Sequence, residues 1–252
     1  MEDNKTNQTA QVKKNGSKEI TGAEALLKSL IEEGVDTIFG YPGGAIMPVY
    51  DKLLDYQDKL RHLLTRHEQG AAHAAQAYAM VSGKPGVCFA TSGPGSTNLI
   101  TGIANAYLDS VPVVFVTAQV VSSLIGSDAF QETDILGVSM PVTKWNCQVK
   151  KAADIPETIA KAFYIATTGR PGPVLIDITK DAQLDKLDYN YRKCSYLRAY
   201  NPHKPLNYDA IESAAIMINH ADKPLILAGH GVLISKAENE LKEFAEKAGV
   251  PV

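Results

Sequence analysis

Short apolar runs that alternate with stretches of helical periodicity constrain the fold of this chain more than any other feature. The runs are rich in valine, isoleucine and phenylalanine and show little alternation with polar residues, which is typical of strands buried on both faces. Alternating strands and helices predict an α/β fold with a doubly wound parallel sheet. The predicted strands are Val35–Phe39, His62–Thr65, Val87–Ala90, Val113–Thr117 and Val174–Ile178.

Composition narrows the class of protein. The chain has 252 residues and a formal net charge of −3. It therefore lacks the net positive charge that is typical of proteins that bind nucleic acids or anionic membranes. No apolar run approaches the roughly 18 residues that a membrane span needs. Cys88, Cys147 and Cys194 have no metal-type spacing, which favours a reducing cytoplasm over secretion.

The sequence predicts four consecutive segments. Residues 1–18 are polar and lack the apolar core of a signal peptide, so we expect a disordered tail. Residues 19–183 form an α/β domain whose first helix starts with a capping box, Thr21-Gly-Ala-Glu24. Residues 184–205 are charged, rich in tyrosine and read as a linker. Residues 206–252 read as the truncated start of a second α/β domain, with helix Leu206–His220, strand Pro224–Ala228 and helix Ala237–Ala248.

Loops that leave the predicted strands are candidate ligand sites, because ligands of open α/β sheets bind at the carboxyl ends of the strands. Their glycines and prolines allow close approach of the backbone to a ligand, but the same residues are common in ordinary turns. The residues alone leave both interpretations open. The candidate loops are Gly40–Gly44, Arg66–Gly70, Ser92–Ser96 and the stretch from Ala118 to Gln131.

Glu68 is the most informative polar residue, since it follows a strand directly and opens a helix of small residues. A carboxylate in a first helical turn is also explained by the helix dipole, so its position alone does not establish a catalytic role. His67 and His73 lack the spacing of a metal site. There is no P-loop motif, and Gly229-His-Gly231 lacks the third glycine of a dinucleotide fingerprint. These patterns indicate a small-molecule cleft without identifying a reaction.

A set of motifs in a fixed order carries a family resemblance. From about Ile20 to Gln183 the chain resembles the large catalytic subunits of the acetohydroxyacid (acetolactate) synthase family, which are thiamine-diphosphate enzymes. The resemblance implies a pyrimidine-binding domain for residues 19–183 and the start of a central FAD-binding-type domain for residues 206–252. The motifs are GVDTIFGYPGGAIMPVYD, RHEQGAAHAAQAYA, FATSGPGSTNLITGIANAYLDSVPVVFVTAQV, IGSDAFQETDI and TTGRPGPVLIDITKDAQ.

The resemblance also implies roles for individual residues. Glu68 matches the glutamate that hydrogen-bonds a ring nitrogen of the cofactor's aminopyrimidine, favouring the tautomer that deprotonates the thiazolium. Phe130 and Gln131 match residues on the substrate side of the cofactor, with Gln131 expected to take part in catalysis. Arg170 matches an arginine that contacts FAD, and Lys180 a lysine of the substrate channel. The positions that match the lining of the aminopyrimidine pocket are Tyr41, Gly44, Pro94 and Asn98.

The implied activity is the decarboxylative condensation of pyruvate with a second 2-keto acid, such as 2-ketobutyrate, in valine, leucine and isoleucine biosynthesis. The implied cofactors are thiamine diphosphate, Mg²⁺ and FAD, in a cytoplasmic homodimer or higher homo-oligomer that can carry a regulatory small subunit. No Gly-Asp-Gly occurs in the chain, so the Mg²⁺ ligands are expected in a C-terminal domain outside these residues. We therefore expect this chain to be an incomplete part of the enzyme, inactive by itself.

Two alternatives stay open. The chain could belong to another thiamine-diphosphate enzyme, such as a pyruvate oxidase or a 2-keto acid decarboxylase, although Asp-Ala-Phe-Gln-Glu and Thr-Lys-Asp favour the synthase. It could also be a non-catalytic pyrimidine-type domain that pairs with a separate chain.

One departure from the family pattern is Val121, where a proline is usual. The change affects the stiffness of a loop and leaves the cofactor positions intact.

Overall fold

The computed structural model describes residues 19–202 and 204–252, which fall into two compact units divided after Pro202. The predicted disordered tail, residues 1–18, lies outside the described residues. The domain boundaries expected at 183/184 and 205/206 stay predictions.

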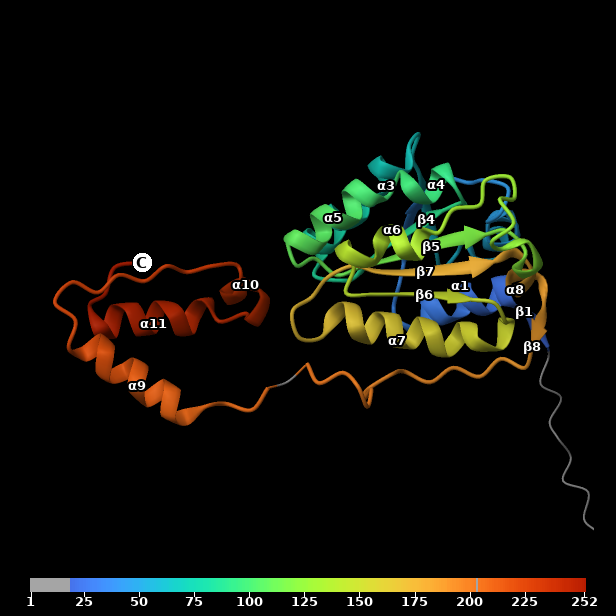
Figure 1. The fold of residues 1–252 in the computed structure, drawn as a ribbon. Helices are drawn as coiled ribbons and strands as arrows, with labels where there is room; N and C mark the ends of the chain where they lie inside the picture. Colours follow the sequence, from blue (N-terminus) through green and yellow to red (C-terminus); the bar gives the residue numbers. More distant parts are fainter. Residues whose placement is uncertain (1–18, 203) are drawn as a thin grey trace, which may run out of the picture. The chain divides into compact units, whose positions relative to one another are not determined.

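The first unit is built on a six-stranded parallel sheet with the order β3-β2-β4-β5-β7-β6, seen edge-on in Figure 1. This confirms the predicted fold class. The four central strands are buried along nearly their whole length, as their apolar sequences require. The strands of this sheet are β2 (Thr37–Gly40), β3 (Arg61–Leu64), β4 (Gly86–Ala90), β5 (Val113–Gln119), β6 (Trp145–Val149) and β7 (Val174–Thr179).

Helices cover both faces of the sheet, and the sheet separates the two larger apolar clusters of the core (Figure 1). On one face lie α1 (Gly22–Glu32), α2 (Met47–Leu53), α7 (Ile155–Thr167) and α8 (Lys180–Leu184). On the other lie α3 (Glu68–Ser82), α4 (Pro94–Thr97), α5 (Ile100–Leu108) and α6 (Ile135–Ser139). Short 3₁₀ turns complete the unit at η1 (Leu54–Tyr56), η2 (Ser122–Leu124), η3 (Met140–Val142) and η4 (Ala152–Asp154).

Helix α1 begins as its sequence predicts, but only half of the expected capping box forms. Thr21 Oγ1 accepts a hydrogen bond from the Glu24 amide at 3.2 Å. The Glu24 carboxylate does not return to the backbone: it accepts from the Tyr56 hydroxyl at 3.0 Å and lies 3.9 Å from Lys52 Nζ. The tertiary partners of Glu24 therefore replace the local contact of the motif.

A small second sheet joins an early and a late segment of the first unit. In it β1 (Ile20–Thr21) pairs antiparallel with β8 (Lys186–Leu187), with Ile20 opposite Leu187. The segment 184–202, predicted as linker, thus contributes a strand to the first unit. Its end is also attached there, because the Tyr200 hydroxyl donates to the Thr168 carbonyl at 2.8 Å.

The second unit is small and mainly helical. It contains α9 (Tyr208–Asn219), α10 (Gly231–Ser235) and α11 (Glu238–Ala248), and within residues 204–252 only Val250 is buried. The predicted strand Pro224–Ala228 is wrong, since that segment has no strand assignment. Its one backbone link to the chain's end runs from the Ile226 amide to the Pro251 carbonyl at 2.9 Å, and a strand needs a ladder of such bonds.

Candidate functional site

The sheet of the first unit reverses its winding direction between β2 and β4. The chain leaves β2 toward β3 on one side and leaves β4 toward β5 on the other. The loops after these two strands therefore diverge onto opposite faces and leave a crevice at their carboxyl ends. These are the loops that the sequence predicts as ligand-binding, together with the turn that leads from β3 into α3.

Glu68 lies at this crevice as the first residue of α3. Its side chain is buried, at 7% exposure, and the Asn98 amide nitrogen donates to Glu68 Oε2 at 3.0 Å. His67 caps the helix, with its Nδ1 accepting from the Gln69 amide at 3.1 Å. The structure thus brings Glu68 and Asn98, two predicted site residues, together through a direct hydrogen bond.

Thr91, the first residue after β4, connects the two diverging loops. Its Oγ1 accepts from the Ala45 amide of the β2 loop at 3.2 Å. A Cβ on Gly43 would lie 2.4 Å from the Thr91 side chain, and one on Gly95 would lie 2.7 Å from it. Glycine is thus required on both loops for them to pack around Thr91. Sequence reasoning missed this residue, whose signal was its place directly after a buried strand.

The second carboxylate oxygen of Glu68 faces Gly95. A Cβ on Gly95 would lie 3.2 Å from Glu68 Oε1, and among the described residues no donor bonds this oxygen. An acceptor oxygen that has no donor among the described residues and lies beside a glycine can take a hydrogen bond from a flat ring that carries an N–H donor. This arrangement fits the aminopyrimidine of thiamine diphosphate.

The loop that follows β5, residues 120–134, carries the predicted substrate-side residues. Phe130 is 87% exposed, and Gln131 is exposed with a left-handed backbone, φ 60°. Gly93, with φ 56°, packs on the Gln131 backbone: a Cβ there would lie 2.6 Å from the Gln131 carbonyl oxygen. The structure therefore places Gln131 against the glycine loop that also carries Gly95 and Asn98.

The remaining predicted pocket residues occupy the same end of the sheet. Tyr41 follows β2 and is 37% exposed, and a Cβ on Gly44 would meet no atom within 4 Å. Pro94 is exposed at the start of α4. Lys180 is half-buried at the start of α8, directly after β7. Their contacts with a ligand stay predictions.

Arg170 lies at the opposite end of the sheet, because it precedes β7 while Glu68 follows β3. Its Nε donates to Ser110 Oγ at 2.8 Å, and its Nη2 donates to the carbonyls of Tyr107 and Leu108 at 3.3 Å. It thereby satisfies carbonyls at the end of α5. These bonds give no sign of a fit to FAD, so the FAD contact stays a prediction.

Buried groups behind the crevice are held in their neutral forms. Burial raises the pKa of the Cys88 thiol, and the nearby Glu68 charge raises it further. Burial likewise raises the pKa of Tyr50, again with a contribution from Glu68. Neither group is a candidate nucleophile or base.

Among residues 19–202 and 204–252, no group of three or more His, Cys, Asp or Glu side chains could hold a metal ion. In the same residues, no helix combines the length and the apolarity needed to cross a bilayer.

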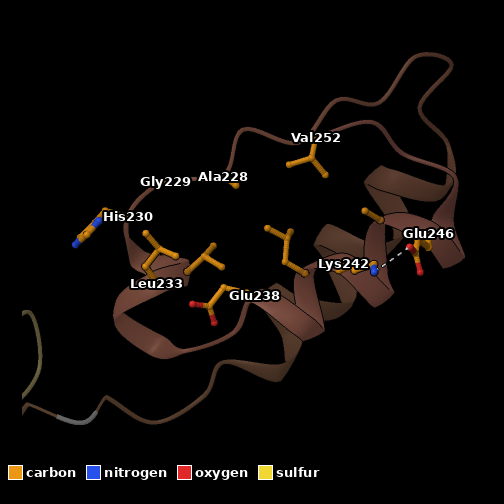
Figure 2. A pocket seen from close by; sticks show the side chains of 11 residues that line it. Ala228, Gly229, His230, Leu233, Glu238, Lys242, Glu246 and Val252 are labelled. Carbon is orange, nitrogen blue, oxygen red and sulfur yellow. Dashed lines mark ion pairs between the residues drawn. The ribbon is translucent and has the colours of Figure 1, made fainter. Parts of the chain in front are cut away.

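The second unit has a hollow of its own, about 580 Å³ in volume (Figure 2). Leu233, Leu241 and Val252 line it with apolar side chains, and Lys242 pairs with Glu246 at 3.9 Å on its border. No buried polar side chain lines it. Its lining is that of an uncovered apolar face and not of a site for chemistry.

Comparison with known proteins agrees with the geometry. Residues 20–138 match the N-terminal TPP-binding domain of thiamine pyrophosphate enzymes, and residues 211–252 match their central domain. The chain is 53% identical over 233 residues to the acetolactate synthase large subunit of Corynebacterium glutamicum, covering 92% of this chain and 37% of the relative. The acetolactate synthase of Mycobacterium bovis is 51% identical over 234 residues, covering 93% and 38%.

The acetolactate synthase large subunit of Haemophilus influenzae is 48% identical over 237 residues, covering 93% of this chain and 41% of the relative. The chain thus spans about two fifths of the length of the curated relatives it matches. Two domain models of one family match in the expected order, and the first of them covers the residues of the Glu68 crevice. The chain therefore belongs to the thiamine pyrophosphate enzyme family.

Proposed function

We propose that this chain supplies the aminopyrimidine side of the active site of an acetolactate synthase. The reaction is the decarboxylative condensation of pyruvate with a second 2-keto acid, 2-ketobutyrate among them, in branched-chain amino acid biosynthesis. The observation that carries the proposal is the buried Glu68, with Asn98 on one carboxylate oxygen and the Gly95 backbone beside the other. The similarity to acetolactate synthases over most of the chain supports the choice of reaction.

Thiamine diphosphate, when bound, supplies a nucleophilic carbon that adds to a 2-keto acid and accepts the electrons left by carbon dioxide. Glu68 Oε1 would accept a hydrogen bond from a ring nitrogen and so fix where the ring proton resides. Asn98 holds the carboxylate in one rotamer through Oε2. The burial of Glu68 itself limits competition from water for that bond.

The other parts of the proposal rest on the resemblance. The resemblance supports the following parts of the proposal: Mg²⁺, FAD, a homodimer or larger homo-oligomer, a regulatory small subunit and a cytoplasmic location. It also supports the need for further domains, since the chain spans about two fifths of its relatives and the described residues hold no metal cluster. By this proposal the chain alone forms no acetolactate.

The role of Glu68 is tested by Glu68→Gln in the complete protein. We expect the exchange of the cofactor's reactive C–H proton with solvent to slow by about 100-fold or more, because the amide cannot hold the ring proton as the carboxylate does. Glu157→Gln is a matched control, since Glu157 is exposed on α7 and forms an ion pair with Lys161 away from the crevice. Unchanged exchange in Glu68→Gln would remove the proposed role.

Product analysis of the complete protein separates the synthase from its alternatives. Pyruvate should yield acetolactate. Acetate or an aldehyde as the main product would instead assign the chain to an oxidase or a decarboxylase of the same family.

A further inference from the structure

A carboxylate lies inside the sheet, in the middle of an otherwise apolar strand. Asp177 of β7 is fully buried, and burial raises its pKa. A buried carboxyl group is costly unless donors surround it. Three neighbours supply them: Thr117 Oγ1 at 2.7 Å, Gln148 Nε2 at 2.9 Å and Gln119 Nε2 at 3.4 Å. The crevice chemistry described above makes no use of this group.

Gln119 extends from Asp177 into the loop that carries Phe130 and Gln131. Its Nε2 also donates to the Thr133 carbonyl at 2.9 Å, near the end of the loop. Its Oε1 accepts from the Val120 amide at 3.0 Å, at the start of the loop. One side chain therefore holds both ends of residues 120–134.

Two further carboxylates act on the same loop. Asp181 accepts from the Ser122 amide at 3.1 Å and from the Ser122 hydroxyl. Glu132 accepts from the Ala129 amide at 3.2 Å and from the Gly126 amide, bracing the loop from within. The loop is thus fixed at its base by the β7–α8 region and internally by its own acid, while Phe130 stays exposed.

We propose that Asp177 and Gln119 are positioning residues that hold the Val120–Asp134 loop so that Gln131 rests on Gly93 beside the Glu68 crevice. Asp177 orients the Gln119 amide, and Gln119 ties the loop ends together. The loop would then present Phe130 and Gln131 to the substrate. This last step rests on the proposed function, whereas the positioning itself does not.

Two matched substitutions in this chain test the positioning. Gln119→Met and Gln148→Met each remove one donor to the same Asp177 oxygen from a neighbouring strand. Of the two, Gln119 alone also holds Val120 and Thr133. We expect both variants to lower the thermal midpoint. We expect only Gln119→Met to speed amide hydrogen exchange at Gly126 and Ala129, by about tenfold.

Equal exchange in the two variants would overturn the proposal, since the loop would then not depend on Gln119. If Gln119→Met does not fold, Asp177→Asn takes its place. The asparagine oxygen can still accept from Thr117, but its NH₂ group then faces the Nε2 donors of both glutamines. We therefore expect the same loop amides to exchange faster while those of α3 keep their rates. Unchanged loop exchange in that variant would equally overturn the proposal.

The complete protein connects the loop to catalysis. Gln119→Met should raise KM for the 2-keto acid about tenfold, while proton exchange on bound thiamine diphosphate stays at the wild-type rate, because Glu68 and Asn98 are untouched. Loss of that proton exchange would contradict a positioning role limited to the loop. Faster loop exchange in a protein that makes no acetolactate would refute the proposed function and leave the positioning intact.

Discussion

Gly95 controls how closely a ring can approach Glu68, so its substitution is a prediction at the scale of one residue. In Gly95→Ala the new Cβ would lie 2.7 Å from Thr91 Cγ2 and 3.2 Å from Glu68 Oε1. We expect a loss of about 1–3 kcal/mol in unfolding free energy and weaker thiamine diphosphate binding in the complete protein. Denaturant unfolding and calorimetric titration measure the two effects.

Gly70→Ala is the matched control, since a Cβ at that helical position meets no atom within 4 Å. We expect it to stabilise the chain by about 0.5–1 kcal/mol. If the two variants had the same unfolding free energy and the same affinity for thiamine diphosphate, the close contact at Gly95 would not limit either property.

The sequence predicts single residues well where their place follows from a strand end. Glu68 lies at the crevice because it follows β3, and Gly44 because it follows β2. Thr91 was missed, since a threonine after a strand carries no motif, and Asp177 was passed over although it stands alone in an apolar run. Arg170 precedes its strand, so the same rule would have placed it at the other end of the sheet.

Strand β3 forms one edge of the sheet, and its His62 gives a prediction at the scale of an element. His62 Nε2 lies 3.1 Å from the Tyr50 hydroxyl, and burial lowers the pKa of His62 from 6.5. The folded state therefore binds this proton less readily than the unfolded state. Its contribution to stability is present above pH 6.5 and is lost as the pH falls through the lowered pKa.

Urea unfolding at a series of pH values between neutral and mildly acidic conditions measures this effect. We expect unfolding free energy to fall with pH in the native chain and to fall less in His62→Phe, which keeps an aromatic ring against Tyr50. A steeper decline in the variant would contradict the assignment.

The sequence predicts a strand or helix well where the local residues alone determine it. The central strands were identified because burial on both faces demands apolar runs. Strand β6 was missed because an edge strand of sequence WNCQV is half-buried and polar in part. Strands β1 and β8 span two residues each and exist only through their pairing, which no local pattern reveals.

At the scale of the whole molecule, the two units differ in how much apolar surface they bury. The first has apolar clusters on both faces of its sheet, while residues 204–252 bury only Val250. We expect a chain ending at Pro202 to unfold in one cooperative transition, with a midpoint within a few degrees of that of the full chain. Scanning calorimetry of both chains measures this. Loss of the cooperative transition on truncation would show that the second unit is needed for the first to fold.

The pairing of β1 with β8 has a consequence for how such a protein is assembled. Since Ile20 and Leu187 are partners, the two ends of the segment 20–187 lie side by side, although the first unit itself continues to Pro202. A segment closed in this way can stand within a longer chain. The flanking parts can then differ in length without changing how its core packs. The closure joins residues far apart in sequence, so this pair is expected to be among the last contacts made as the nascent chain folds.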